Sequence, residues 1–259
     1  MMMRRRNEPT ACREELLMRT IAKRLAVLCA ITLAALIACS APGVKEAPGT
    51  YLNPAAIDVS AVLPAPPADG SLAGLADLET VRMVQSWRTP DQIAWAKKTD
   101  GEDPFHYNAV VGSWFTAKNL PGCAKFFMQV LHDARKVSNR VKDLHKRPRP
   151  PKRDERVTPS LPIPKSLSYP SGHSTRTFTI AYVIAELFPD KRTAIVDFAH
   201  RDAWARIIAG VHYPTDDVGG RLLAGAVFSE LNKSAKFRAT LDECRAEIAA
   251  YRKRAGGVR

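Results

Sequence analysis

The sequence predicts an all-α fold, a single compact helical bundle with its functional side chains at helix ends and in connecting loops. Three observations support this prediction. Apolar residues recur at helical spacing in one segment after another beyond residue 70. No hairpin signal occurs, and no run alternates polar and apolar residues for long. The chain has 259 residues, 46% of them hydrophobic, which is enough to bury one large core.

Residues 1–38 are typical of an export signal. Two basic residues precede an apolar run over 25–37, which is too short for a comfortable membrane span. The four residues that end at Cys39 resemble a lipobox, so we expect Cys39 to be lipidated after cleavage. Ordinary cleavage near Ala41 and a retained anchor are the alternatives. Met18 would also make a normal signal-peptide start. We therefore expect a periplasmic protein that meets a bacterial membrane through a lipid anchor only.

The next segments lead into the helical part. Residues 39–54 are rich in Ala, Pro and Gly and are expected to form a flexible tether. The domain itself is expected over 55–259, with a Pro-rich extended lead-in at 62–71. Apolar residues at three-residue intervals then predict an amphipathic helix over 72–87, with the apolar stripe Leu72, Leu75, Leu78, Val81 and Val84.

The later helices have their own start and stop signals. Thr89 is an N-cap, Pro90 takes the first helical position, and Gln92 is placed for a capping box. The basic, Pro-rich segment 146–164 is expected to be a loop. Further helices are predicted at 108–118, 121 to about 148, 174–188, 191–209, 214–231 and 236–254.

The charge and the cysteines set limits on function. The formal net charge of +13 favours a cleft that attracts anions, with nucleic acid, anionic lipid and phosphorylated metabolites as candidates. Cys123 and Cys244 are the cysteines that remain after removal of the signal segment. The sequence is compatible with a disulfide between them and equally with two buried free thiols. No cysteine, histidine or carboxylate pattern has the spacing of metal ligands, so no metal is expected.

Three separated clusters carry residues that suit phosphate chemistry. In the first, Lys142 lies at a helix end, and Arg149 is held in the following turn by Pro150. Alone, this segment is more typical of a solvated basic loop or a nucleic-acid patch. His145 lies inside it and is expected to point to solvent or substrate.

The second cluster is the turn Tyr169–Ser174. A Pro-Ser-Gly turn that feeds a helix aims backbone N–H groups and the Ser171 hydroxyl at one point, with the His173 imidazole beside them. Such a turn can bind an anion and donate a proton to it. Alone, it is more often a simple helix cap.

The third cluster joins Arg206, His212 and Asp216. An Asp four residues after a His can accept the Nδ1–H bond, which leaves Nε2 as a lone pair. Alone, this pair is more often a structural hydrogen bond. The combination of all three clusters favours a catalytic site.

Together the clusters resemble the three-part signature of the type-2 phosphatidic acid phosphatase superfamily, which also includes vanadium haloperoxidases. The lead-in at 63–71 and the sequence from Ser168 to His173 are similar to class A bacterial non-specific acid phosphatases. The resemblance covers about residues 51–250. Ala205 departs from it, since the family often has Ser there, and this change is expected to alter rate or specificity rather than reaction type.

The resemblance implies a mechanism. His212 would attack phosphorus and form a phosphohistidine, with Asp216 orienting it. His173 would protonate the leaving alcohol and then act as a base towards water. An acidic optimum follows if His173 is protonated while His212 is neutral. No cofactor is implied, and the phosphate oxygens would be held by Lys142, Arg149, Ser171, Gly172 and Arg206.

The expected function is that of an exported, metal-independent acid phosphatase with broad specificity for small phosphomonoesters. Phosphate or vanadate would inhibit it, and it is compatible with a homo-oligomer. The alternatives are a vanadium-dependent haloperoxidase, a lipid phosphatase on the same scaffold, and a non-catalytic protein that binds nucleic acid through 146–156. We expect no nucleic-acid partner.

Overall fold

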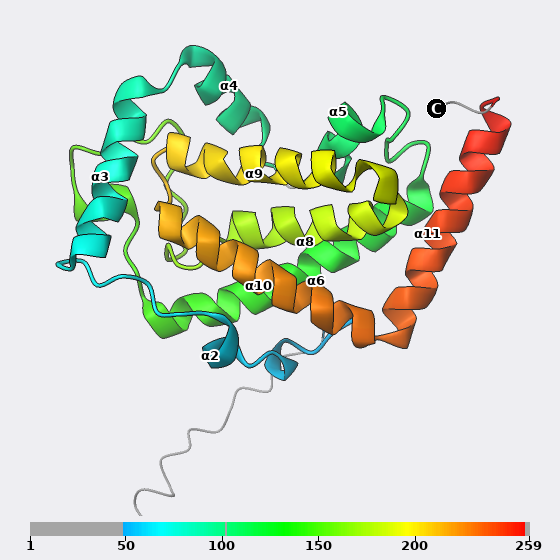
Figure 1. Cartoon of the computed structure of the whole chain (residues 1–259), viewed down its shortest axis with the longest axis horizontal. Helices are drawn as coiled ribbons and strands as arrows, with labels where there is room; N and C mark the ends of the chain where they lie inside the picture. Colours follow the sequence, from blue (N-terminus) through cyan, green and yellow to red (C-terminus); the bar gives the residue numbers. More distant parts are fainter. Residues whose placement is uncertain (1–48, 102, 257–259) are drawn as a thin grey trace, which may run out of the picture. The chain divides into compact units, whose positions relative to one another are not determined.

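The computed structural model describes residues 49–101 and 103–256, which belong to one unit of the chain. Every regular element in these two stretches is a helix, so the predicted all-α fold is confirmed (Figure 1). None of these helices combines the length and the apolar character that a membrane crossing requires. The predicted signal segment and Cys39 lie outside the described residues.

The chain enters this part of the fold beside the long helix α6 (Pro121–His145). The backbone N–H groups of Thr50 and Tyr51 each donate to the Asp133 carboxylate, at 2.7 Å. The Tyr51 side chain is buried and joins the core. Residues 49–54, predicted to end a flexible tether, therefore pack against the domain, because a buried carboxylate on α6 needs these donors.

Helix α3 (Leu72–Trp87) has the predicted bounds, and Leu78, Val81 and Val84 of the predicted stripe pack into the core, but the first part of the stripe does not. Leu72 and Leu75, predicted to lie on the apolar stripe, are 87% and 50% exposed. The buried positions include Asp77 and Val81. Asp77 also faces inward, where its carboxylate forms a buried ion pair, so the buried face of the helix includes a carboxylate that was not predicted.

Helix α4 (Pro90–Lys98) begins with the predicted capping box. The Gln92 N–H donates to Thr89 Oγ1 at 3.2 Å, and the Thr89 N–H donates to Gln92 Oε1 at 2.9 Å. Two N–H groups that the helix itself cannot satisfy are thereby paired.

Short helices join the longer ones. Helix α5 ends at Val111 rather than at the predicted residue 118, because Gly112 adopts φ +131°, which ends the helix. A short helix also forms within the predicted loop 146–164. The short elements are η1 (Pro54–Ala56), α2 (Val59–Val62), η2 (Pro104–Tyr107), α5 (Asn108–Val111), α7 (Pro150–Arg153) and η3 (Pro189–Lys191).

Helix α8 is the centre of the bundle. It contacts α6, α9 and α10, and in Figure 1 it lies between α9 and α10 with α6 behind. Its Phe178 and Ile184 side chains are fully buried in the core. Helix α11 packs on α6 and α10. The bounds are α8 (Gly172–Leu187), α9 (Arg192–Ile208), α10 (Pro214–Lys233) and α11 (Ala235–Arg254).

Helix α10 approaches the turn before α8 unusually closely, through two glycines. A Cβ on Gly219 would lie 2.7 Å from the Tyr169 ring, and one on Gly220 would lie 2.7 Å from the Ser171 carbonyl oxygen. Neither position has room for a side chain. The paired glycines therefore allow the turn to rest on the backbone of α10.

The two cysteines of the domain are buried free thiols. Cys123 lies in the first turn of α6, and its Sγ is 3.8 Å from the Cys244 carbonyl oxygen on α11. Of the two alternatives left open by the sequence, the structure contains the pair of thiols. Burial and the neighbouring Cys244 thiol raise the pKa of Cys123, which makes this thiol unreactive.

The ends of four helices meet at one place. The Lys142 ammonium, near the end of α6, donates to the Pro170 carbonyl oxygen just before α8, at 2.7 Å. The Ser171 N–H donates to the Asp216 carbonyl oxygen in α10, at 2.9 Å. Arg149 donates to the Val211 carbonyl oxygen after α9, also at 2.7 Å. The predicted gathering of functional residues at helix ends is therefore present.

Candidate active site

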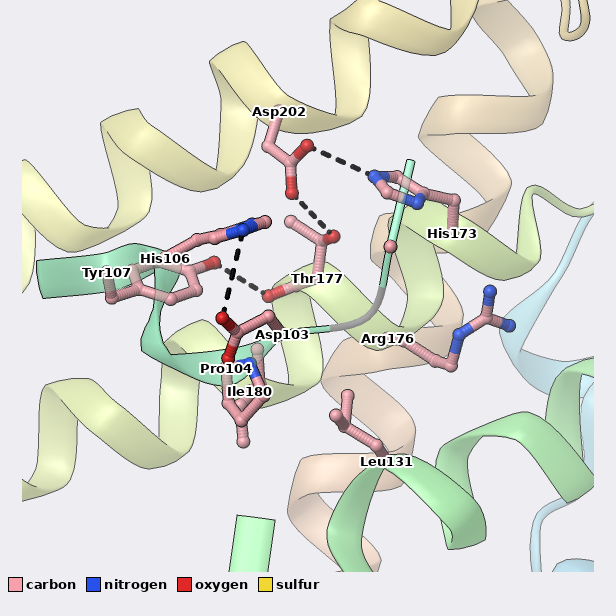
Figure 2. A pocket seen from close by; sticks show the side chains of 11 residues that line it. Asp103, Pro104, His106, Tyr107, Leu131, His173, Arg176, Thr177, Ile180 and Asp202 are labelled. Atoms are coloured by element: carbon pink, nitrogen blue, oxygen red, sulfur yellow. Dashed lines mark hydrogen bonds and ion pairs between the residues drawn. The ribbon is translucent and has the colours of Figure 1, made fainter. Parts of the chain in front are cut away.

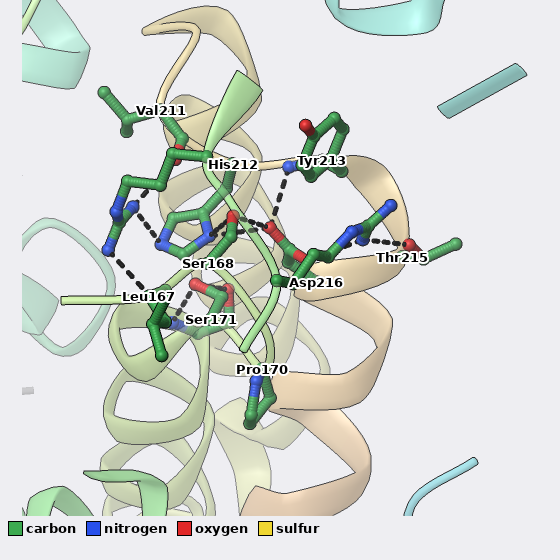
Figure 3. Close-up of polar contacts among 12 residues, drawn as sticks. Leu167, Ser168, Pro170, Ser171, Val211, His212, Tyr213, Thr215 and Asp216 are labelled. Carbon is green, nitrogen blue, oxygen red and sulfur yellow. Dashed lines mark hydrogen bonds and ion pairs between the residues drawn. The ribbon is translucent and has the colours of Figure 1, made fainter. Parts of the chain in front are cut away.

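His212 and Asp216 form the buried pair that the sequence predicts (Figure 3). His212 follows α9, Asp216 lies in the first turn of α10, and Nδ1 is 3.0 Å from Oδ2. On the other side of the ring, Arg149 Nη1 is 3.0 Å from Nε2. A guanidinium only donates, so Nε2 accepts and Nδ1 carries the proton that Asp216 binds. The pair thus holds a lone pair on Nε2, as expected for a nucleophile.

The surroundings keep His212 neutral. Burial and the positive charge of Arg149 lower the pKa of His212 to about 3, and the opposing influence of Asp216 does not offset them. Burial alone would raise the pKa of Asp216, but the hydrogen bond from His212 and the charge of Arg147 lower it to about 2. Above pH 4 or so the pair is therefore a neutral imidazole beside a carboxylate.

Two further side chains hold Asp216, and neither was predicted. Ser168 donates its hydroxyl to Oδ2. Arg147 Nη1 donates to Oδ1 at 2.7 Å, and its Nη2 donates to Asp77 at 2.7 Å. The backbone N–H of Tyr213 also donates to Oδ2, at 3.0 Å. Asp216 is therefore oriented by donors on both oxygens.

Lys142 and Arg149 are held by backbone carbonyls that precede α8. Lys142 Nζ donates to the Leu167 carbonyl oxygen at 2.6 Å, and Arg149 Nε donates to that of Ser166 at 2.7 Å. Burial and the nearby charge of Arg149 lower the pKa of Lys142 to about 7. Burial also lowers the pKa of Arg149 to about 10. An arriving anion would favour the charged form of both groups.

Arg206 is buried at the end of α9 and is fixed by α4 and the residues after it. It donates to the carboxylate of Asp100, to the Ala96 carbonyl oxygen and to the Thr99 hydroxyl, the last at 3.2 Å. Burial lowers its pKa, although Asp202 and Asp100 act in the opposite direction. Arg206 thus reaches the site as a third fixed cation.

The Ser171 position differs from the prediction. The Ser171 N–H is taken by the Asp216 carbonyl oxygen, and Ser171 Oγ caps α8 by accepting from the Ser174 N–H at 3.2 Å. Ser171 therefore shapes the turn, and its N–H is not available to hold phosphate. Gly172 faces the cavity, where a Cβ would lie 3.0 Å from Arg176 Nη1.

Most of the predicted site residues line one cavity of about 220 Å³, while Ser171 and Asp216 lie outside its lining. Its walls come from all three sequence clusters, so residues up to 70 positions apart meet in one space. The predicted residues that line it are Lys142, Arg149, Gly172, His173, Arg206 and His212, and Arg176 lines it without having been predicted.

His173 has a partner that the sequence analysis missed. Its Nε2 is 3.2 Å from Asp202 Oδ1 on α9, and Thr177 donates to the other oxygen of Asp202 at 3.1 Å (Figure 2). Burial opposes ionisation of Asp202, but the charge and hydrogen bond of His173 hold the pKa of Asp202 below its usual value. His173 also lines a second, narrower cavity with Tyr107 and Ile180.

The sequence contains signals that could have identified Asp202 and Arg147. Asp202 is four residues before Arg206, so both lie on one face of the same helix and look toward the same place. Arg147 precedes Pro148 just as Arg149 precedes Pro150, and the same restraint applies to both.

The last two expectations for the site concern His145 and metal ligands. His145, expected to point to solvent or substrate, packs edge-on against the Tyr169 ring, with the centroids 5.1 Å apart. Within residues 49–101 and 103–256, no group of three or more His, Cys, Asp or Glu is placed to hold a metal ion. The arrangement can bind a tetrahedral anion, attack it with a neutral imidazole and protonate a leaving group.

The sequence is similar to those of known proteins. Residues 123–238 match the model of the PAP2 superfamily. The chain is 28% identical over 252 residues to a non-specific acid phosphatase of Providencia stuartii, across 89% of this chain and 99% of that protein. A shorter stretch of 64 residues is 42% identical to a lipid A 1-phosphatase of Rhizobium johnstonii, across 25% of this chain and 26% of that protein.

Among solved structures, the crystal structure of LpxE from Aquifex aeolicus aligns with a TM-score of 0.46 and 22% sequence identity. The alignment covers 61% of this chain and 95% of that one.

Proposed function

The chain carries a PAP2 superfamily domain, and from this premise we propose that it is an acid phosphatase that hydrolyses small phosphomonoesters through a phosphohistidine. The observation that carries the proposal is the neutral His212, held by Asp216, in a cavity that Lys142, Arg149 and Arg206 also line. The similarity to the Providencia acid phosphatase over nearly the whole of that protein supports the same reaction. Broad specificity and independence from metal belong to this proposal.

The first half of the reaction transfers the phosphoryl group to His212. The phosphate oxygens draw the guanidinium of Arg149 away from Nε2, and the lone pair of Nε2 then points at phosphorus. The Nε2–P bond forms as the P–O bond to the alcohol breaks, and His173 gives its proton to the departing oxygen. The positive charge that develops on the His212 ring is stabilised by Asp216 through Nδ1–H.

The second half returns the enzyme to its resting state. His173, now neutral, takes a proton from water as the water oxygen attacks phosphorus. The new P–O bond forms, the Nε2–P bond breaks, and inorganic phosphate leaves. The three cations hold the oxygens of the transferred group in both halves, because charge is spread over these oxygens in each transition state.

Acidic conditions suit this cycle. With a pKa of about 3, His212 stays neutral in mildly acidic solution and keeps the lone pair that the first half of the reaction needs. Lys142, with its pKa near 7 in the empty site, carries its charge in acid and loses it in base. The phosphate-binding charge is thus greatest on the acidic side of neutrality.

A substrate panel tests the proposal. Purified protein is assayed for phosphate release from alkyl and aryl phosphomonoesters, a phosphodiester and a diphosphate, with and without EDTA, beside His212→Ala. We expect hydrolysis of several monoesters, no effect of EDTA, competitive inhibition by phosphate and vanadate, and an inactive variant. Monoester turnover that survives in His212→Ala would contradict the mechanism.

A second candidate is a lipid phosphatase, favoured by the 64-residue similarity to the Rhizobium lipid A 1-phosphatase. The same panel distinguishes the two when it includes vesicles that contain a phosphorylated lipid. Faster phosphate release from the vesicles than from small monoesters, at matched concentrations, would favour this candidate.

We also propose that the protein is exported to the periplasm and anchored through Cys39, on the basis of its amino-terminal sequence. Cell fractionation and mass spectrometry of the mature amino terminus test this. A mature protein that begins at a lipidated Cys39 is expected. A periplasmic protein that begins near Ala41, or an uncleaved chain, would contradict the anchor.

A further inference from the structure

A chain of buried charges runs from helix α3 to the proposed nucleophile. Asp77 on α3 accepts from Arg147 Nη2 at 2.7 Å, and Arg147 Nη1 donates to Asp216 Oδ1 at 2.7 Å. Asp216 Oδ2 in turn accepts from His212 Nδ1 at 3.0 Å. The side chains of Asp77, Arg147 and Asp216 are 4%, 2% and 0% exposed, so solvent screens these interactions very little.

The surroundings fix this chain in one geometry. Thr215 donates its N–H to Asp77 Oδ1 at 3.2 Å and accepts from Arg147 Nη1 at 2.8 Å through its hydroxyl. The Arg147 guanidinium also lies 3.9 Å over the centre of the Tyr213 ring. Arg147 is therefore held from three sides, and it in turn holds one oxygen of Asp216 so that the other faces His212.

The charges matter as well as the geometry. Arg147 draws part of the negative charge of Asp216 toward itself and away from the His212 ring. Asp77 offsets Arg147 from the opposite side and so leaves more of that negative charge for His212. A buried carboxylate with this effect lies about 70 residues before Arg147 in the sequence and outside the three sequence clusters.

We propose that Asp77 and Arg147 are positioning residues that set the strength of the Asp216–His212 hydrogen bond. The proposal rests on the proposed function, in which that bond stabilises the charge that develops on His212. Asp77 acts through Arg147, and Arg147 acts through Asp216. Neither residue lines the cavity that would hold the phosphate.

Other charged groups also act on His212 and must stay constant in any test. Lys142 comes from α6, Arg149 from the segment before α7, and Arg206 from α9. The charged or titratable side chains that line the cavity with His212 are Asp100, Lys142, Arg149, His173, Arg176 and Arg206, and Asp216 contacts the His212 ring. Variants of Asp77 and Arg147 leave all of them in place.

The test uses Asp77→Asn, Arg147→Met and the double variant of the whole protein, with Asp133→Asn as the matched control. Asp133 is likewise a fully buried carboxylate, but it binds backbone N–H groups near residue 50. It lies nine residues before Lys142 on α6, roughly 13 Å along the helix. Its loss should lower stability without an effect on His212.

Kinetics provide the first measurement. We expect Asp77→Asn to lower kcat about tenfold or more, on alkyl and aryl phosphates alike. Arg147→Met should lower it further, because Asp216 then loses the donor that orients it, and this loss of orientation outweighs the negative charge that His212 gains. In the Arg147→Met background, Asp77→Asn should change kcat by less than about threefold, because its effect passes through Arg147. The same factor in both backgrounds, or a kcat of Asp77→Asn close to that of the wild type, would overturn the proposal.

Titration of the His212 ring by 15N NMR provides the second measurement, and it requires no turnover. Arg147→Met should raise the pH at which His212 takes up a proton, and Asp77→Asn should lower it. General damage to the fold would not give opposite signs, and Asp133→Asn should give no shift. Identical titrations in all variants would overturn the proposal even if the protein proved not to be a phosphatase.

Discussion

The contact between His173 and Asp202 gives the sharpest prediction about the proton donor. Asp202→Asn keeps the shape of the side chain and removes its charge. Asp202 is 7% exposed, and its oxygen lies 3.2 Å from His173 Nε2. A hydrogen bond to a charged group in such a place contributes about 1.5–3 kcal/mol. Since about 1.4 kcal/mol corresponds to a factor of ten, we expect kcat/KM for an alkyl phosphate to fall roughly 10- to 100-fold.

The assay compares two leaving groups. An alkyl alcohol must be protonated as it leaves, whereas p-nitrophenolate leaves without a proton. In kcat/KM, which reports the transfer to His212 and not the later hydrolysis, Asp202→Asn should therefore lose roughly 10- to 100-fold on an alkyl phosphate and only about threefold or less on p-nitrophenyl phosphate. His173→Ala should show the same selectivity with a larger loss, up to about 10,000-fold.

A graded control completes this experiment. Thr177→Val removes the hydroxyl that donates to the other oxygen of Asp202 at 3.1 Å, and it should give a smaller loss with the same selectivity. Equal losses on both substrates in Asp202→Asn would refute the reasoning, because they would separate Asp202 from the protonation of the leaving group.

Three further predictions follow from the structure. The kcat/KM should fall above pH 7, because Lys142, whose pKa is about 7, loses its charge in the free enzyme. Lys142→Arg should move this fall in kcat/KM to higher pH. A fall at the same pH in the variant would mean that another group causes it. Gly220→Ala places a Cβ 2.7 Å from the Ser171 carbonyl oxygen. Calorimetry should therefore show a loss of about 1–3 kcal/mol in unfolding free energy, and kcat should also fall. An unchanged unfolding free energy and kcat would exclude the close approach of α10 to the turn before α8. Asp133→Asn weakens the 2.7 Å hydrogen bonds from the N–H groups of Thr50 and Tyr51. Urea unfolding should show a loss of about 1.5–3 kcal/mol in unfolding free energy, with kcat unchanged. An unchanged urea midpoint would mean that Asp133 does not hold the segment around residue 50 against α6.

Much of the fold follows from local signals. The bounds of α3 and the capping box of α4 were predicted because caps and apolar periodicity act within a few residues. The burial of Asp77 on α3 could not be predicted in the same way. It depends on an ion pair with Arg147, and the local sequence of a helix does not specify a partner so far along the chain.

The site shows the same division. The His212–Asp216 pair was predicted because both residues lie within one turn of chain, where spacing fixes distance. Ser171 was predicted to offer its N–H to phosphate, but the packing of α10 against the turn supplies another acceptor, the Asp216 carbonyl oxygen. Asp202 reaches His173 only through the packing of α9 on α8, which the sequence does not specify.

The central claim is that Nε2 of His212 is the nucleophile that forms the bond to phosphorus. The most direct measurement mixes the protein with a 32P-labelled monoester, stops the reaction in alkaline denaturant, where phosphohistidine is stable, and maps the label by peptide analysis. Label on the peptide that contains His212, absent in His212→Ala and still present in a properly folded His173→Ala, is the predicted result. Label on a different residue, or full turnover by His212→Ala, would contradict the account.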